Sequence, residues 1–177
     1  VRQVWRIHKA GSLDRLRHEQ DELAAPGPGQ VRGAIGAIGL NFADVFACLG
    51  LYSATPAGPF VPGLEFAGVV EEAGAGVTRL VPGSLVMGLT RFGAYATHIN
   101  VDTSYLRSVP AGWTLADGAA YPVQAITAWY AIRDLGACRS ADAVLVHSAA
   151  GGVGLNALAI LAALGARTIA TVGSETK

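Results

Sequence analysis

The sequence has few charged residues and few cysteines, and both shortages exclude classes of function. Only 15% of its 177 residues are charged, and its 13 basic side chains equal its 13 acidic ones in number. A net charge of zero offers no basic surface to nucleic acid or to an anionic membrane. Two cysteines, Cys48 and Cys138, are too few for a disulfide framework or a zinc–thiolate site. We therefore expect a cytoplasmic protein, or one of another reducing compartment, without nucleic-acid or membrane partners.

The sequence also lacks the patterns typical of a signal peptide and of a membrane-spanning helix. Arg2, Arg6 and Lys9 interrupt the first residues, so we expect no signal peptide. Residues 148–166 carry no charge and approach the roughly 20 residues of a spanning helix. Their first third is rich in glycine, however, and the uninterrupted helical part would reach only about 15 Å at 1.5 Å per residue. This stretch predicts a buried helix between two strands.

Apolar residues and glycine are abundant by contrast. The hydrophobic fraction of 51% excludes intrinsic disorder, and the 23 glycines follow no collagen-like period. Up to Val109 the chain consists of short strand-like segments bounded by Gly, Pro or Asp, with one helix between Asn41 and Gly50. These segments are residues 2–8, 31–39, 66–72, 85–89, 95–101 and 105–109. They predict a small β-barrel or sandwich.

The pattern changes after Pro110. Thr114 and Asp117 resemble a capping box, and a helical run over residues 119–135 is expected to break at Pro122. A buried strand (143–147), a glycine loop, a helix (153–164) and a second strand (168–172) form one βαβ unit. The predicted fold class is therefore α/β plus β, with a β domain at residues 1–113 and the start of a Rossmann-type domain at residues 114–177.

The glycine loop has the pattern of a dinucleotide site. Ala149, Gly151 and Gly154 occupy the three small-residue positions of the fingerprint. A side chain at Gly151 would block the pyrophosphate, and one at Gly154 would push the helix off the strand. The helix N-terminus would offer N–H groups to the phosphates. The alternative is a merely structural turn. The expected phosphate-contacting residues are Ala150, Gly151, Gly152, Val153 and Gly154.

The end of the second strand bears on the choice of cofactor. An NAD site has a carboxylate about 20 residues after the loop, where it binds the ribose 2′-hydroxyl. Here Gly173 and Ser174 stand in that region and Lys177 follows, so a hydroxyl and an ammonium group could hold a 2′-phosphate. This favours NADPH over NADH. Glu175 argues the other way, and Lys177 has the alternative role of a solvated residue in the next helix.

Four motifs together resemble the medium-chain dehydrogenase/reductase superfamily, and within it the zinc-free quinone oxidoreductase branch. They are GLNFAD (39–44), PGLEFAG (62–68), AAGGVG (149–154) and TVGSETK (171–177). The resemblance covers the whole chain. It implies a GroES-like β-barrel followed by a Rossmann domain, of which the chain holds only the first part.

Shorter motifs are similar to the enoyl reductase domains of polyketide and fatty-acid synthases. These are GSLDRL (11–16), VMGL (86–89), YATH (95–98), PAGW (110–113) and TAWY (127–130). The resemblance implies NADPH-dependent reduction of an activated C=C bond in a small or carrier-bound enoyl thioester or enone. It also implies a homodimer, formed through a Rossmann edge strand that this chain lacks, or membership of a multidomain synthase. The alternatives are a free-standing NADPH quinone oxidoreductase and a truncated, non-catalytic component of a larger assembly.

The same resemblance bears on zinc. Zinc alcohol dehydrogenases of the superfamily have a cysteine near the position of Asn41 and a Gly-His-Glu at the position of residues 63–65. This chain has Asn41 and Leu64 instead, and Glu65 alone cannot supply the roughly three protein ligands of a catalytic zinc. We expect no metal.

Three residues are expected beside the reacting groups because of the family likeness. Asn41 resembles a residue on the nicotinamide side, although it could also simply cap the helix. Tyr52 resembles a substrate-pocket tyrosine linked to proton delivery and product stereochemistry, with packing on the helix end as the alternative. Thr127 resembles a cofactor-contacting hydroxyl, or it satisfies a carbonyl one turn back. Asp44 is interpreted as a helix-start charge.

Overall fold

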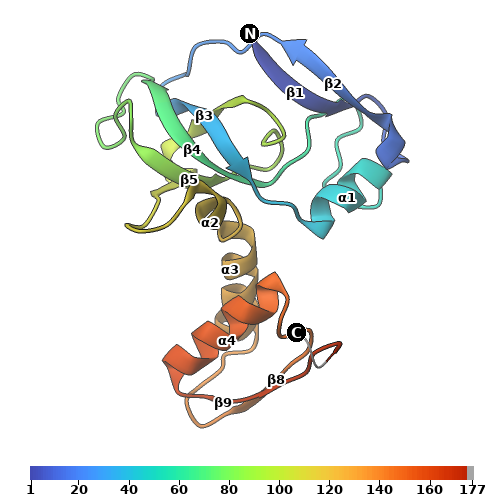
Figure 1. The fold of residues 1–177 in the computed structure, drawn as a ribbon, viewed down its shortest axis with the longest axis vertical. Coiled ribbons are helices and arrows are strands. Elements are labelled where there is room, and N and C mark those ends of the chain that lie inside the picture. Colours follow the sequence, from blue (N-terminus) through green and yellow to red (C-terminus); the bar gives the residue numbers. More distant parts are fainter. Residues whose placement is uncertain (175–177) are drawn as a thin grey trace. The chain divides into compact units, whose positions relative to one another are not determined.

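Antiparallel pairing of short strands builds the first part of the chain in the computed structural model, which describes residues 1–174 (Figure 1). Five strands form one sheet in the order β6-β3-β4-β5-β7, and β1 pairs with β2 in a second, two-stranded sheet. The strands are β1 (Arg2–Ile7), β2 (Leu16–Asp21), β3 (Gln30–Ile38), β4 (Glu65–Ala73), β5 (Leu85–Leu89), β6 (His98–Asp102) and β7 (Leu106–Ser108). Isolated bridges from Val4 to Ala96 and from Ile7 to Phe60 attach β1 to neighbouring segments.

An apolar core holds the five-stranded sheet together. Side chains from all five strands meet in it, and Phe66 on β4 is fully buried at its centre. Gly68 allows β3 to approach β4 closely, since a Cβ there would lie 2.0 Å from the carbonyl oxygen of Ala34. The buried members are Val31, Phe66, Val70, Val86, Ala94, Ile99, Val101 and Leu106.

Short helices complete this unit. α1 (Phe42–Leu49) ends at Gly50, which adopts a left-handed conformation with φ 75°. α2 (Leu115–Ala119) begins with the predicted capping box, which is confirmed: the Thr114 N–H donates to Asp117 at 2.8 Å and the Asp117 N–H donates to Thr114 at 3.1 Å. Two 3₁₀ turns, η1 (Leu13–Arg15) and η2 (Thr103–Tyr105), precede β2 and β7.

Charged residues explain why β2 was missed in the sequence. Its segment, LRHEQD, has a single apolar residue and no alternation of apolar and polar side chains. Ion pairs across the β1–β2 ribbon replace apolar packing: Arg2 binds Asp21 at 2.7 Å, and Arg6 binds Glu19 at 3.1 Å and also Asp21. A strand that is held by ion pairs shows no alternation of apolar and polar residues, so hydrophobic periodicity does not predict it.

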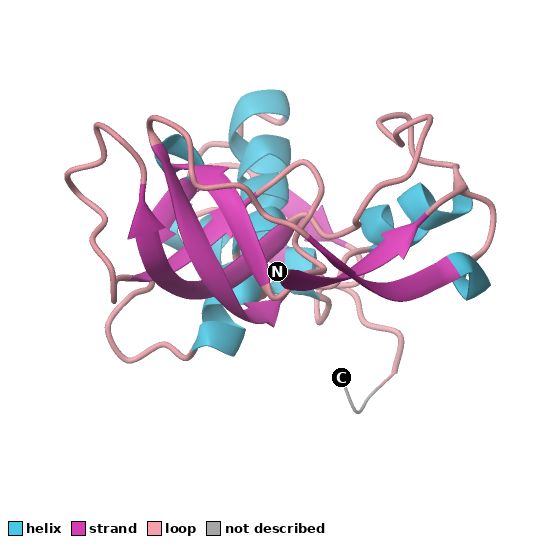
Figure 2. Ribbon diagram, turned by 90° about the horizontal axis from the view of Figure 1, so that it is seen from above, coloured by secondary structure: helices cyan, strands magenta, loops and turns pink. Residues whose placement is uncertain are grey.

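The second unit contains the predicted βαβ element. Parallel strands β8 (Ala143–Val146) and β9 (Arg167–Ala170) are joined by α4 (Gly152–Leu164), as Figure 1 shows, and α4 ends at the left-handed Gly165. Figure 2 distinguishes the helices of the chain in cyan from its strands in magenta. α3 (Pro122–Trp129) starts at its proline and continues as a π-helical turn, η3 (Tyr130–Leu135). α3 and α4 pack on each other around a small core of Ala128, Ile132, Cys138, Ala157 and Leu161.

The two compact units divide between Ala120 and Tyr121, whereas the sequence predicts a boundary after residue 113. The difference arises because α2 packs on β3, β4 and β5 and so groups with the first unit. The apolar stretch 148–166 is a helix between two strands, as predicted. Within residues 1–174, no helix has both the length and the apolar character needed to cross a membrane.

Candidate functional site

Asn41 lies where β3 ends and α1 begins, and two acidic side chains hold it. Its backbone N–H donates to the Asp44 carboxylate at 2.9 Å, which is one half of a capping box. Its side-chain Nδ2 donates to Oε1 of Glu65, the first residue of β4, at 2.8 Å. Asn41 is half-buried, whereas Asp44 and Glu65 are 2% and 0% exposed and are the buried charged residues of the described chain. The motifs GLNFAD and PGLEFAG therefore meet at this asparagine.

A glycine makes room for the Glu65 carboxylate. A Cβ on Gly39 would lie 2.2 Å from Glu65 Oε1 and 2.4 Å from the carbonyl oxygen of Ala119. Backbone contact at this point also includes a hydrogen bond from the Gly39 N–H to the Glu65 carbonyl at 3.3 Å. Gly39 thus allows the end of β3, the start of β4 and the end of α2 to close around one carboxylate.

Asp44 lies in the first turn of α1, as the sequence indicated, and its side chain is buried there. Burial raises its pKa, against the opposing effects of the Asn41 and Gly63 N–H groups and the Tyr95 hydroxyl. The pKa of Tyr95 is raised in turn by burial and by the Asp44 charge, and the same two causes raise the pKa of the Cys48 thiol. This unexposed group of ionisable side chains escaped the sequence analysis because its members come from α1 and from the segment before β6.

Tyr52 follows α1 closely. Its N–H donates to the carbonyl oxygen of Phe46 at 3.2 Å, and its side chain is 36% exposed. Within the described residues its hydroxyl has no hydrogen-bond partner and is open to a ligand. Leu40, Phe42 and Leu51, which all precede Tyr52 in the sequence, are exposed at 70%, 81% and 72%. The role of Tyr52 in proton delivery stays a prediction.

The glycine loop of the second unit has the geometry of a phosphate cradle. Ser148 leaves β8 in a left-handed conformation with φ 52°, and its carbonyl oxygen accepts a hydrogen bond from the Gly151 N–H at 2.9 Å. A Cβ on Gly154 would lie 2.5 Å from the Ser148 oxygen and 2.6 Å from Ala149 Cα, so α4 touches the loop that follows β8. Gly151 is the N-cap of α4 and has no side chain to occupy the first-turn N–H groups. The loop therefore fits a dinucleotide pyrophosphate at Ala150, Gly151, Gly152, Val153 and Gly154.

Two α3 residues bear on this loop. The Thr127 hydroxyl donates to the Val123 carbonyl at 2.7 Å, which is the alternative role considered for it, and its contact with a cofactor stays a prediction. Gln124, which the sequence analysis did not single out, covers the start of the loop: a Cβ on Gly152 would meet its amide oxygen at 1.8 Å.

The end of β9 leaves the expected ribose site open. A Cβ on Gly173 would have no neighbour within 4 Å, and Ser174 is exposed. Lys177, the third residue predicted at this site, lies outside the described residues, as does Glu175. The preference for NADPH over NADH thus stays a prediction from the sequence.

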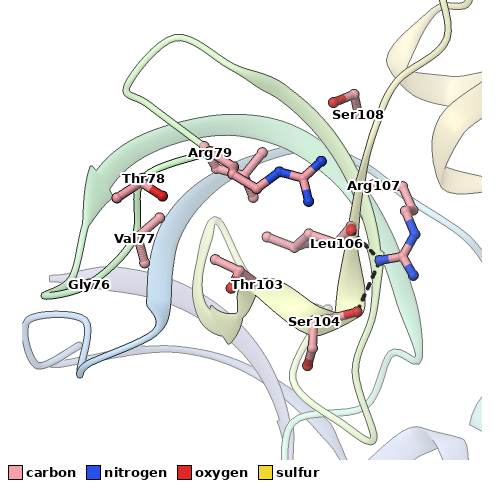
Figure 3. A pocket seen from close by; sticks show the side chains of 10 residues that line it. Gly76, Val77, Thr78, Arg79, Thr103, Ser104, Leu106, Arg107 and Ser108 are labelled. Atoms are coloured by element: carbon pink, nitrogen blue, oxygen red, sulfur yellow. Dashed lines mark hydrogen bonds between the residues drawn. The ribbon is translucent and has the colours of Figure 1, made fainter.

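A pocket of about 760 Å³ lies elsewhere in the first unit, between the β4–β5 loop and the η2–β7 segment (Figure 3). Arg79 reaches across it, while Arg107 is bonded to the backbone oxygens of Ser104 at 3.0 Å and Leu106 at 2.7 Å. None of the predicted site residues lines this pocket. Over residues 1–174, no three His, Cys, Asp or Glu side chains come together as a metal site.

Comparisons with known proteins agree with this architecture. Residues 27–111 match the family described as the alcohol dehydrogenase GroES-like domain. The chain is 48% identical over 162 residues to the pikromycin polyketide synthase component PikAII of Streptomyces venezuelae. The aligned region covers 88% of the chain and 4% of that synthase.

Two solved structures share its fold. The CurK enoyl reductase superposes with a TM-score of 0.91 at 29% identity, covering 99% of the chain and 55% of that protein. The quinone oxidoreductase of Escherichia coli, solved in complex with NADPH, gives 0.88 at 32% identity, covering 99% and 54%. The chain thus spans a small part of the curated synthase and about half of each solved protein.

Fold and likeness together define the class: a GroES-like barrel followed by the opening βαβ unit of a Rossmann domain, as predicted. These findings fit the medium-chain dehydrogenase/reductase superfamily, and the sequence relatives of the chain include polyketide synthases.

We predict that Asp44→Asn changes how stability depends on pH. Because burial raises the pKa of Asp44 above its ordinary 3.8, the folded protein holds this proton more tightly than the unfolded chain does. The contribution of Asp44 to the free energy of unfolding is therefore greatest below about pH 4 and falls as the pH rises through the folded-state pKa. Urea unfolding across this pH range should show a flatter profile for Asp44→Asn. The exposed Asp134→Asn is the control, and identical wild-type and Asp44→Asn profiles would contradict the burial effect.

Gly154→Ala should weaken the contact between α4 and β8. The added Cβ would meet backbone atoms of Ser148 and Ala149, which cannot move aside as a flexible side chain can. Overpacking of this kind costs about 1–3 kcal/mol of unfolding free energy, measurable by urea denaturation. Gly173→Ala is the matched control, since its Cβ would enter open space. Equal stability of the two variants would show that Gly154 is not under this constraint.

Proposed function

We propose that the protein is an NADPH-dependent reductase of an activated C=C bond, of the enoyl reductase type. The observation that carries the proposal is the likeness of nearly the whole chain to a polyketide synthase component and to an enoyl reductase structure. Within the chain, the motifs GLNFAD and PGLEFAG meet at Asn41, and AAGGVG forms the glycine loop.

The cofactor would bind to the second unit at the N-terminus of α4. Residues 150–154 would hold the pyrophosphate, while Gly173, Ser174 and Lys177 would accommodate the phosphorylated ribose. The bound reduced nicotinamide supplies the hydride. A solved relative in complex with NADPH supports the phosphorylated cofactor over NADH.

A substrate that is already polarised fits the residues present. No three potential metal ligands cluster in the described chain, and Glu65 is engaged with Asn41. In an enoyl thioester or enone, the conjugated carbonyl spreads the charge that develops when hydride adds to the β-carbon. Asn41 would orient the nicotinamide or the substrate carbonyl, and the Tyr52 hydroxyl would deliver a proton to the α-carbon. Hydride and proton together saturate the double bond.

A free-standing quinone oxidoreductase is the second candidate, favoured by the 32% identity to the Escherichia coli enzyme. The polyketide synthase relatives argue instead for a place in a multidomain synthase that presents a carrier-bound substrate. A homodimer and a non-catalytic structural role stay predictions from the sequence.

Turnover by the full natural protein that contains this chain distinguishes these functions. NADPH oxidation should be followed with a crotonyl thioester and, separately, with a benzoquinone. We expect reduction of the thioester, with NADPH preferred over NADH. Activity with the quinone alone would contradict the enoyl reductase assignment. A protein that binds no NADPH would contradict both enzyme functions and favour the structural role.

Tyr52→Phe tests the proton donor. Loss of a positioned general acid typically slows a reaction about 10²-fold or more, so kcat should fall by that order or the α-carbon should be protonated from the other face. Steady-state kinetics and chiral analysis of an α-methyl product measure both effects. Tyr105→Phe, on the exposed η2 turn, is the control. Unchanged rate and stereochemistry in Tyr52→Phe would remove Tyr52 from the mechanism.

A further inference from the structure

Two buried acids converge on a single half-buried asparagine. Asp44 accepts the backbone N–H of Asn41 at 2.9 Å and Glu65 accepts its side-chain Nδ2 at 2.8 Å. Burying a carboxylate is costly unless hydrogen bonds satisfy it, and the described chain buries these two acids and no other charged residue. Asp44 thus holds Asn41 at its backbone, and Glu65 holds it at its side-chain amide.

Helix capping accounts for only one of these contacts. An N-cap residue contributes its side-chain oxygen and its backbone to the start of a helix. Capping makes no use of the side-chain nitrogen, which is the atom that Glu65 binds. Glu65 also belongs to a different element, β4, 24 residues further along the chain. The Glu65 contact therefore needs another explanation.

The direction of this hydrogen bond fixes the orientation of the amide. A carboxylate oxygen accepts hydrogen bonds and does not donate them, so it binds Nδ2 and repels Oδ1. Rotation of the Asn41 amide by 180° about χ2 would place its Oδ1, in place of Nδ2, against Oε1 of Glu65. The Asn41 amide consequently presents one face only, with Oδ1 and the second N–H directed away from Glu65.

The backbone around Glu65 is shaped for this contact. A Cβ at Gly39 would collide with the Glu65 carboxylate at 2.2 Å and with the Ala119 oxygen at 2.4 Å. The Gly39 N–H to Glu65 carbonyl bond keeps the two strand ends together at the same point. Rigid support of this kind holds a reacting group within a few tenths of an ångström of its productive position.

We propose that Glu65 is a positioning residue that fixes the Asn41 amide for hydride transfer. The proposal rests on the proposed reductase function, in which Asn41 orients the nicotinamide or the substrate carbonyl. Glu65 itself touches neither. It acts through Asn41 by setting which amide atoms face the reacting groups.

A double-mutant cycle on the full natural protein tests the coupling. Glu65→Ala should lower kcat for crotonyl thioester reduction about 10- to 100-fold, as loss of a supporting hydrogen bond to an active-site residue commonly does. KM for NADPH should change little, since the glycine loop supplies most of the cofactor contacts. In an Asn41→Ala background the same Glu65 substitution should lower kcat no further. Additive losses would show that Glu65 acts independently of Asn41 and would overturn the proposal.

Two further variants separate positioning from folding. Glu65→Gln retains an oxygen that can accept the Asn41 Nδ2 and should keep most of the wild-type kcat, whereas a loss equal to that of Glu65→Ala would contradict positioning by this hydrogen bond. Leu106→Ala removes a buried side chain of the same sheet and should lower the melting temperature without lowering kcat. A fall in kcat in Leu106→Ala that matches Glu65→Ala would attribute the effect to general destabilisation and overturn the proposal.

Crystal structures of the wild type, Glu65→Gln and Glu65→Ala provide a readout that needs no turnover. We expect the Asn41 amide in one orientation in the first two and in a shifted or split orientation in Glu65→Ala. An unmoved Asn41 in Glu65→Ala would overturn the positioning role even in an active enzyme. A wild type without reductase activity would contradict the proposed function, while the Asn41 orientation in the variant crystals would still decide what Glu65 holds in place.

Discussion

Close approach of backbone to neighbouring atoms is the constraint on which both units depend. At Gly68 strand β3 comes within contact of β4, at Gly39 three elements close around a carboxylate, and at Gly154 helix α4 touches the loop before it. At each of these positions even one methyl group would meet main-chain atoms at 2.6 Å or less. The large share of glycine in the sequence is thus the condition for bringing functional groups together, as well as a source of turns.

How far the sequence predicts this structure depends on what holds each part together. The βαβ unit, the capping box at Thr114 and the glycine loop follow from local rules of helix starts and apolar strands, and they are present as expected, although β8 is only partly buried. β2 follows no such rule, because its pairing depends on ion pairs with a strand elsewhere in the sequence. The Glu65–Asn41 bond joins residues 24 positions apart, and the burial of Asp44 depends on neighbours from another segment. Contacts of this range have no signature in a single sequence.

The candidate sites of the two units offer different chemistry. The second unit offers uncharged backbone N–H groups and a bare helix start, which suit a ligand that brings its own negative charge. The first unit offers side-chain hydrogen-bonding groups, with their charges hidden beneath the surface at Asp44 and Glu65. The N–H groups of the second unit belong to the main chain, whereas the Asn41 amide of the first unit is a side-chain group bonded to the buried Glu65.

The ion pairs of the β1–β2 ribbon have a consequence for how this protein responds to its solvent. β1 is anchored to the core by the buried side chains of Val4 and Ile7, but no residue of β2 is fully buried. Dissolved ions screen exposed charges while many strengthen apolar burial. High ionic strength should therefore loosen β2 while it tightens the five-stranded sheet.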